Sequence, residues 1–129
     1  QVSAADLSHD ALAIARKNAA DNQASVTFYQ GDLFAAIPAV MRFDLILSNP
    51  PYIESEECKT LQAEVLQEPL MALDGGEDGL DFYRSIAVHY KSALRDGGYL
   101  CFEFGMGQEL DVCRILAEND YEIVQLRKI

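Results

Sequence analysis

The hydrophobic and polar positions of this chain fall into short blocks that predict strands alternating with helices. An apolar stretch leads up to Asp6, and residues 25–30 alternate between apolar and polar until Gly31 and Asp32, so both segments read as strands. Residues 43–48 form a nearly continuous apolar run, which is typical of a parallel strand covered on both faces. Two later strands are predicted at 99–104 and 121–129.

Helix signals lie between these strands. Ser8 is a good N-cap for a helix over 8–22. A helix over 81–95 is predicted with one apolar stripe, followed by Gly97 as a left-handed residue after its end, and another helix is predicted over 108–120. The two apolar stripes are Phe82, Ile86, Tyr90 and Leu94 in the first helix, and Leu110, Cys113 and Ala117 in the second. A short helix is expected within 54–67, and 70–80 reads as a loop.

This alternation predicts an α/β fold with a mostly parallel sheet and helices on both faces, in one domain that spans residues 1–129. In open sheets of this kind, ligands bind outside the carboxyl ends of the strands. Asp6, Asp32 and Asn49 each follow such an end. We therefore expect the three polar side chains to converge on one rim.

Composition narrows the classes of function. The 129 residues carry 10 Lys and Arg against 21 Asp and Glu, for a formal charge of −11, which argues against direct nucleic-acid binding. The chain has no apolar run long enough to cross a membrane. Its three cysteines lack a CxxC spacing and its two histidines lie far apart, so we expect no metal and a reduced, cytoplasmic protein.

Two carboxylates and one glycine pair have both a functional and an ordinary interpretation. Asp6 could accept both hydroxyls of a ribose, or it could be a plain carboxylate at a helix entry. Asp32 could accept from an adenine amino group, or it could belong to a simple turn after Gly31. The FGMGQ segment has the form of a dinucleotide fingerprint, but its third glycine would fall at Leu110, so we interpret it as a turn.

The NPPY motif, Asn49 to Tyr52, is the most specific signal. An NH₂ nitrogen conjugated to a carbonyl or a ring is a poor nucleophile, because its lone pair is delocalised. The Asn49 side-chain oxygen and the Pro50 carbonyl can accept its two N–H bonds and aim the lone pair at an electrophile. Pro50 and Pro51 stiffen the loop, and Tyr52 can stack on the flat amide or base. The motif therefore predicts methylation of a planar nitrogen, and a loop that is merely rigid is the ordinary alternative.

Several blocks together resemble a known family. They are AADLSHDALAIARKNA, QGDLF, FDLILSNPPYI, EPLMALDGGEDGLDFYR at 68–84, and GGYLCFEFGMGQ. With these, the chain resembles the S-adenosylmethionine-dependent methyltransferases, and more narrowly the protein-(glutamine-N5) methyltransferases of peptide chain release factors, the HemK or PrmC family. NPPY alone is shared with DNA adenine and RNA guanine methyltransferases, whereas the 68–84 block points to the release-factor enzymes.

The resemblance implies a Rossmann-like class I methyltransferase fold, with S-adenosyl-L-methionine as the cofactor and the glutamine of the Gly-Gly-Gln motif of release factors as the substrate. It implies that Asp6 binds the ribose, that Asp32 and Leu33 lie beside the adenine, and that Asn49 also belongs to the cofactor site. It further implies that Asn49 and Pro50 hold the substrate amide and that Tyr52 packs against it.

The chain departs from the family pattern at both ends. The family's first strand, its glycine-rich methionine-binding loop, its N-terminal helical domain and its last strand have no counterpart in this sequence. We therefore expect a partial catalytic domain that binds the cofactor poorly by itself. A nucleic-acid amino methyltransferase and a non-catalytic interaction module are the alternative functions.

Overall fold

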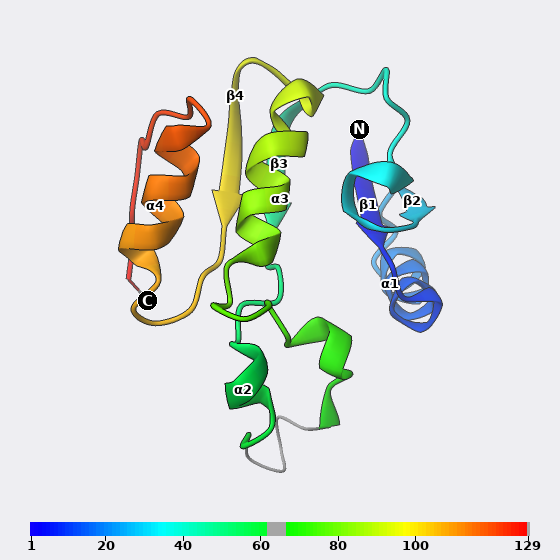
Figure 1. Cartoon of the computed structure of the whole chain (residues 1–129). Coiled ribbons are helices and arrows are strands. Elements are labelled where there is room, and N and C mark those ends of the chain that lie inside the picture. Colours follow the sequence, from blue (N-terminus) through cyan, green and yellow to red (C-terminus); the bar gives the residue numbers. More distant parts are fainter. Residues whose placement is uncertain (62–66, 129) are drawn as a thin grey trace. The chain divides into compact units, whose positions relative to one another are not determined.

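The computed structural model describes residues 1–61 and 67–128, without the side chains of residues 33 and 34. These residues form two compact units, Gln1–Arg42 and Phe43–Ile129. Hydrogen bonds within the described chain build one parallel pair of strands in each unit and no larger sheet (Figure 1). The prediction of an α/β fold with parallel strands is confirmed, and the expected sheet is present as two separate pairs.

The first unit is a β-α-β motif. Strands β1 (Val2–Asp6) and β2 (Val26–Gln30) pair in parallel, with Asp6 opposite Gln30. Helix α1 (His9–Asp21) connects them and packs on both. The Ser8 hydroxyl caps this helix by accepting from Ala11 N at 3.1 Å, as the sequence predicts. Leu12 is the buried residue of the helix, and a 3₁₀ turn, η1 (Leu33–Ala36), follows β2.

The second unit is built on strands β3 (Phe43–Ser48) and β4 (Leu94–Phe102), which also pair in parallel. The connection between them contains the short helices α2 (Ser55–Cys58), η3 (Leu70–Ala72), α3 (Asp81–His89) and η4 (Lys91–Ala93). Helix α4 (Glu109–Glu118) follows β4. Figure 1 shows α3 and α4 running alongside β4.

The core of the second unit lies where α3 meets α4. Its buried residues are Leu80, Tyr83, Ala87, Val112 and Ile115. Tyr83 has no exposed surface, and its ring meets that of Phe102 edge to face at 5.2 Å between centroids. The Tyr83 hydroxyl donates to the Glu103 carbonyl at 2.9 Å, and burial raises the pKa of Tyr83, so the phenol stays a donor.

Substitutions at Tyr83 should therefore reduce stability in two steps. Tyr83→Phe should cost about 1 kcal/mol, because the Glu103 carbonyl loses its donor. Tyr83→Ala should cost roughly 3–5 kcal/mol, because it also removes a fully buried ring. Urea denaturation of the 129-residue chain measures both values, and equal stabilities for the two variants would contradict this account.

The predicted end of the 81–95 helix is wrong. Helix α3 stops at His89, and residues 94–98 belong to β4. Leu94 pairs with Phe43, and the register then shifts so that Tyr99 pairs with Leu45. Gly97 does have the left-handed backbone expected of it, with φ +76°, but it serves this irregularity in β4 rather than a helix end.

The buried helix faces also differ from the predicted stripes. In α3, Tyr83 and Ala87 join Ile86 in the core, whereas Phe82 is only partly buried. In α4, Val112 and Ile115 are buried, and the predicted Leu110 is 74% exposed. Both helices are apolar on two adjoining sides, so spacing alone could not select the side that meets the other helix.

Two further expectations about the second unit are wrong. Residues 121–128 form no strand, because no described segment offers them a ladder of hydrogen bonds. Within the second unit taken by itself, strand β3 lacks cover on one face, since Leu45, Leu47 and the β4 residue Tyr99 are 51%, 71% and 55% exposed. The short helix expected within 54–67 is confirmed as α2, Ser55–Cys58, and residues 62–66 lie outside the described chain.

Candidate functional site

In the first unit, the candidate cofactor residues lie at the carboxyl ends of the paired strands. The carbonyl of Asp6 accepts from Gly31 N at 3.1 Å, which ties the end of β1 to the end of β2. The Asp6 side chain is oriented by Ser8 N, which donates to Oδ1 at 2.7 Å. Asp6 and Asp32 are both exposed. The strand pairing thus brings these two carboxylates to the same edge, where a ligand can reach them.

Leu33 begins the η1 turn directly after Asp32, but its side chain lies outside the described part of the chain. Its place beside an adenine stays a prediction. The convergence of Asp6 and Asp32 with Asn49 also stays a prediction, because these residues belong to different units and each unit is described by itself.

In the second unit, the NPPY loop leaves the end of β3. Asn49 is exposed, Pro50 is buried, and Pro51 and Tyr52 are half-buried. The Tyr52 ring packs against the core of the unit, and a Cβ atom on Gly105 would lie 2.8 Å from the ring's Cδ2 atom. The loop is therefore anchored on both sides of Asn49, by β3 before it and by Pro50 and Tyr52 after it.

Backbone hydrogen bonds tie the next residues to the glycine-rich segment. Ile53 N donates to the Leu73 carbonyl at 3.0 Å, and Gly75 N donates to the Ile53 carbonyl at 2.8 Å. Ser55 N donates to the Gly76 carbonyl at 2.9 Å. These bonds form a short parallel bridge in which Ile53 is opposite Asp74. The segment that the sequence reads as a loop is therefore the support of the NPPY loop.

The glycines of this segment allow the two chains to approach closely. A Cβ atom on Gly75 would lie 2.7 Å from the Pro51 carbonyl oxygen, which is too close for a real side chain. A Cβ atom on Gly79 would meet the Tyr52 carbonyl oxygen. Side chains larger than hydrogen at these positions would displace the NPPY loop.

Asp74 fastens the same bridge through its side chain. Its Oδ1 atom accepts from the Ser55 hydroxyl at 2.7 Å and from Gly76 N at 2.9 Å. The Ser55 hydroxyl is the main cause that lowers the pKa of Asp74, with Gly76 N next. The carboxylate is thus held in its charged form between the two chains that it joins.

The lowered pKa gives a pH-dependent contribution to stability. An Asp in the unfolded chain titrates near pH 4, and folded Asp74 titrates below its ordinary value. Its contribution is therefore present above about pH 4 and is lost as the pH falls through the folded-state pKa. We expect Asp74→Asn to lower the free energy of unfolding near neutral pH and to match the wild type at low pH, measured by urea denaturation.

The exposed carboxylate of Asp96 provides the matched control. Asp96→Asn should leave the free energy of unfolding unchanged near neutral pH. A destabilisation by Asp74→Asn that persists at every pH would show that the carboxylate charge is not involved.

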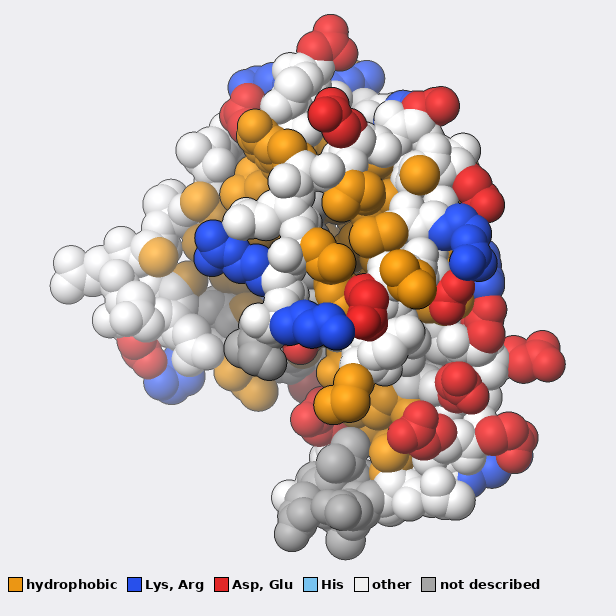
Figure 2. All heavy atoms as spheres, turned by 90° about the vertical axis from the view of Figure 1, so that its left-hand side faces the viewer, with side chains coloured by type: hydrophobic (Ala, Val, Ile, Leu, Met, Phe, Trp, Pro, Cys, Tyr) orange, Lys and Arg blue, Asp and Glu red, His pale blue; other side chains and the backbone are white. Residues whose placement is uncertain are grey.

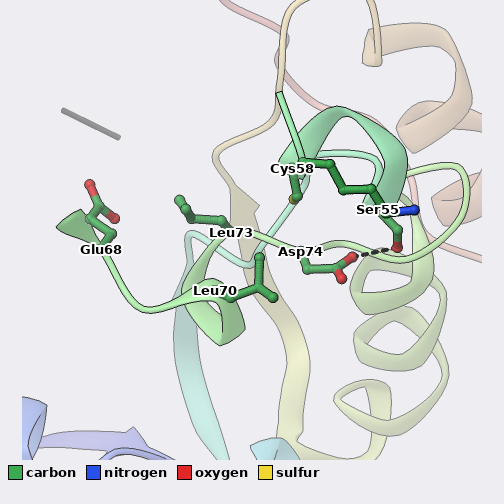
Figure 3. Close-up of a pocket in the computed structure, with 7 residues that line it drawn as sticks. Ser55, Cys58, Glu68, Leu70, Leu73 and Asp74 are labelled. Carbon is green, nitrogen blue, oxygen red and sulfur yellow. Dashed lines mark hydrogen bonds between the residues drawn. The ribbon is translucent and has the colours of Figure 1, made fainter. Parts of the chain in front are cut away.

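A pocket of about 440 Å³ lies beside this bridge (Figure 3). Its lining residues are Ser55, Cys58, Lys59, Glu68, Leu70, Leu73 and Asp74. Figure 3 shows the bond between Ser55 and Asp74 at its edge. Burial raises the pKa of the Cys58 thiol, with Asp74 and Glu57 adding to the effect, so the thiol is held neutral. None of the residues predicted for the site lines this pocket.

The support of the NPPY loop contains residues that sequence reasoning did not single out. They are Asp74, Gly75, Gly79 and Gln108. The first three lie in the 68–84 block, so that block's resemblance to one family was a usable signal. Gln108 ends the GGYLCFEFGMGQ block of the resemblance, but the FGMGQ segment reads as a turn, so its side chain is assigned no role from the sequence. The turn itself is present, with Gln108 N donating to the Gly105 carbonyl at 3.1 Å.

The described residues contain no group of three His, Cys, Asp or Glu side chains that could hold a metal ion. No helix among them is both long and apolar enough to cross a membrane. Figure 2 shows the face with α4, where acidic side chains are widespread and hydrophobic ones lie in the open between them. The exposed hydrophobic residues of the second unit include Met106, Leu110 and Val124.

Comparison with known proteins identifies the family. Residues 1–102 match the model of the methyltransferase small domain. The chain is 48% identical to a release factor glutamine methyltransferase of Geobacter sulfurreducens over 122 residues. The aligned region covers 94% of this chain and 43% of that protein. Proteins of the same name from Bacteroides thetaiotaomicron and Fusobacterium nucleatum are 42% and 39% identical, over 99% and 98% of this chain and 47% and 36% of their own lengths.

The chain thus spans less than half the length of these curated relatives. Their shared name confirms the resemblance to the glutamine methyltransferases of release factors that the sequence blocks indicated. The match of the family model extends over both units and ends at the last residue of β4. The chain belongs to the methyltransferase small domain family.

Proposed function

We propose that this chain carries the catalytic residues of an S-adenosylmethionine-dependent enzyme that methylates N5 of the glutamine in the Gly-Gly-Gln motif of peptide chain release factors. The name of the relatives supports the substrate, and the family supports methyl transfer. The observation that carries the proposal is the geometry of the NPPY loop. Asn49 is exposed at the end of β3, while the residues that follow it are packed and hydrogen-bonded to a second segment.

Asn49 and Pro50 are proposed to bind the substrate amide. The Asn49 side-chain oxygen accepts one N–H of the glutamine NH₂ group, and the Pro50 carbonyl accepts the other. Both oxygens also stabilise the positive charge that the nitrogen acquires in the reaction. Pro50 and Pro51 have fixed φ angles, and Pro50 is buried, so the two acceptors keep their spacing. Tyr52 and Pro51 complete the wall against which the amide lies.

The residues of the first unit fit the cofactor. The Asp6 carboxylate is exposed at a strand end, and Ser8 N fixes its orientation through one oxygen. A carboxylate in this position can accept both hydroxyls of a ribose. Asp32, exposed after the neighbouring strand, and Leu33 are proposed to bind the adenine. When bound, S-adenosylmethionine supplies an electrophilic methyl group on a sulfonium.

The test is methyl transfer in a full-length framework. We define the Geobacter chimera as the Geobacter sulfurreducens relative with its matching region replaced by this sequence. With labelled S-adenosylmethionine, the chimera should methylate a release factor and should leave a release factor with Gln replaced in its Gly-Gly-Gln motif unlabelled. Labelling of DNA or ribosomal RNA instead would favour a nucleic-acid amino methyltransferase. A folded chimera that labels neither would favour an interaction module.

A separate prediction concerns the cofactor. Asp6→Asn keeps an oxygen for Ser8 N but replaces the other carboxylate oxygen with a donor, so one ribose hydroxyl loses its acceptor. The loss of a hydrogen bond to a charged group should weaken S-adenosylmethionine binding by about 10-fold or more. Calorimetric titration of the Geobacter chimera measures this, with the exposed Asp10→Asn as the matched control. Equal affinities for Asp6→Asn and the unsubstituted chimera would remove Asp6 from the ribose site.

A further inference from the structure

The side chain of Gln108 connects three segments of the second unit that are far apart in the sequence. Its Nε2 atom donates to the Tyr52 carbonyl at 3.0 Å and to the Gly79 carbonyl at 3.4 Å. Its Oε1 atom accepts from Gly105 N at 2.9 Å. The amide is partly buried. One side chain thus links the NPPY loop, the glycine-rich segment and the turn before α4.

The chemistry of the contact requires an amide. Two carbonyl oxygens face Nε2 and one backbone N–H faces Oε1, so the side chain must both donate and accept. A carboxylate would keep the bond to Gly105 N but would turn an oxygen towards the two carbonyls. An apolar side chain of the same length would leave all three backbone groups without this partner. Gln108 therefore selects one arrangement of the three segments.

The Tyr52 carbonyl links Gln108 to the NPPY loop, which holds the proposed substrate-binding residues. Tyr52 lies two residues after Pro50, and its backbone is also in contact with Gly75 and Gly79. The Gln108 side chain can therefore affect the rate of methyl transfer without contacting the substrate. A shift of the Tyr52 carbonyl would turn the rigid Pro50-Pro51 unit and move the Asn49 and Pro50 acceptors with it. A displacement of about 1 Å at reacting groups can cost about 100-fold in rate.

We propose that Gln108 is a positioning residue for methyl transfer, which holds the NPPY loop in its productive geometry by donating to the Tyr52 carbonyl. This inference rests on the proposed function, since it assigns the loop its role. It adds Gln108, which follows β4 in the sequence and lies outside the NPPY motif, to the residues on which the reaction depends. The FGMGQ turn would then support the NPPY loop rather than bind a cofactor.

Three variants of the Geobacter chimera test the proposal. Gln108→Glu removes both donors and keeps the acceptor for Gly105 N, and Gln108→Met removes both kinds of bond. Both should lower kcat for methyl transfer to a release factor by about 10- to 100-fold, with S-adenosylmethionine affinity within a few-fold of the unsubstituted chimera. Gln125→Glu, at an exposed position of the same unit, introduces the same charge and should leave kcat unchanged.

The pH dependence separates positioning from a general loss of structure. In Gln108→Glu, protonation of the carboxyl restores one O–H donor for the Tyr52 carbonyl. The ratio of its kcat to that of the unsubstituted chimera should therefore rise as the pH falls from about 8 towards about 5, whereas the ratio for Gln108→Met should stay constant. A constant ratio for both variants, or kcat values equal to that of the unsubstituted chimera, would overturn the proposal.

Hydrogen exchange on the 129-residue chain tests the contact independently of activity. The Gly105 amide should exchange faster in Gln108→Met than in Gln108→Glu, because only the Glu variant keeps the acceptor. Equal exchange rates in both variants would show that Gln108 Oε1 does not accept from Gly105 N. If the unsubstituted chimera methylates no release factor, the proposed function fails, and this exchange experiment still decides whether Gln108 holds the loop.

Discussion

Asn49→Ala is expected to lower kcat of the Geobacter chimera for release-factor methylation by at least about 100-fold. The substitution removes the side-chain oxygen that we propose accepts one N–H of the substrate amide, and preorganised groups of this kind are typically worth 100- to 1,000-fold in rate. Asn49 is exposed, so the free energy of unfolding should stay unchanged. S-Adenosylmethionine affinity should stay within a few-fold, because the ribose and adenine are assigned to the first unit. Single-turnover transfer of labelled methyl groups measures the rate.

Two other variants make this result specific. Asn49→Asp retains a side-chain oxygen as an acceptor, so its rate should lie between those of Asn49→Ala and the unsubstituted chimera. Asn18→Ala deletes the same side chain from an exposed position of α1 and should have no effect on the rate. Undiminished turnover by Asn49→Ala would refute the role assigned to the NPPY loop.

Gly79→Ala is expected to have a comparable effect on the rate through the backbone. Gly79 has φ +72°, and a Cβ atom there would meet the Tyr52 carbonyl oxygen. The left-handed conformation costs an alanine about 1–2 kcal/mol, and the contact additionally forces the NPPY loop to move. We expect kcat to fall by about 100-fold, in line with a displacement of roughly 1 Å at the acceptors.

Gly97→Ala is the matched control for this substitution. Gly97 has nearly the same backbone conformation, φ +76°, but nothing lies within 4 Å of a Cβ atom built on it. Both variants should lose stability from the strained backbone, measured by urea denaturation, and Gly79→Ala should lose more because of its contact with Tyr52. Only Gly79→Ala should lose its catalytic rate, and an equal loss of rate in both variants would mean that the Tyr52 contact plays no part.

The parts of the fold that depend on neighbouring residues could be predicted from the sequence. Ser8 caps α1 because its hydroxyl reaches a backbone N–H three residues ahead, and the alternation in 25–30 is a local property of β2. The end of α3 could not be predicted in this way. Asp96-Gly97-Gly98 is a good helix terminator, but pairing of Leu94 with Phe43 draws these residues into β4. Tertiary pairing overrode the local signal.

In the candidate site, too, local sequence patterns can be recognised, whereas contacts between distant residues cannot. Asn49 and Pro50 are contiguous, so the chemistry of their pattern can be recognised in the amino-acid sequence itself. The bonds that hold them in place join residues that are distant in sequence, such as Gln108 and Tyr52, which are separated by 56 positions. Such a contact leaves no periodicity or spacing to detect. The residues proposed to bind the substrate amide can therefore be named from the sequence, whereas the contact of Gln108 with Tyr52 cannot.

The backbone bridge between Ile53 and the glycine-rich segment has a consequence for engineering. Recombination of this chain with another methyltransferase should succeed only when residues 49–55 and 73–81 are inherited from the same parent. A crossover placed between them would match one parent's motif with the other parent's scaffold. Segments 49–55 and 73–81 should therefore be exchanged together, although the sequence alone would suggest that they can be exchanged independently.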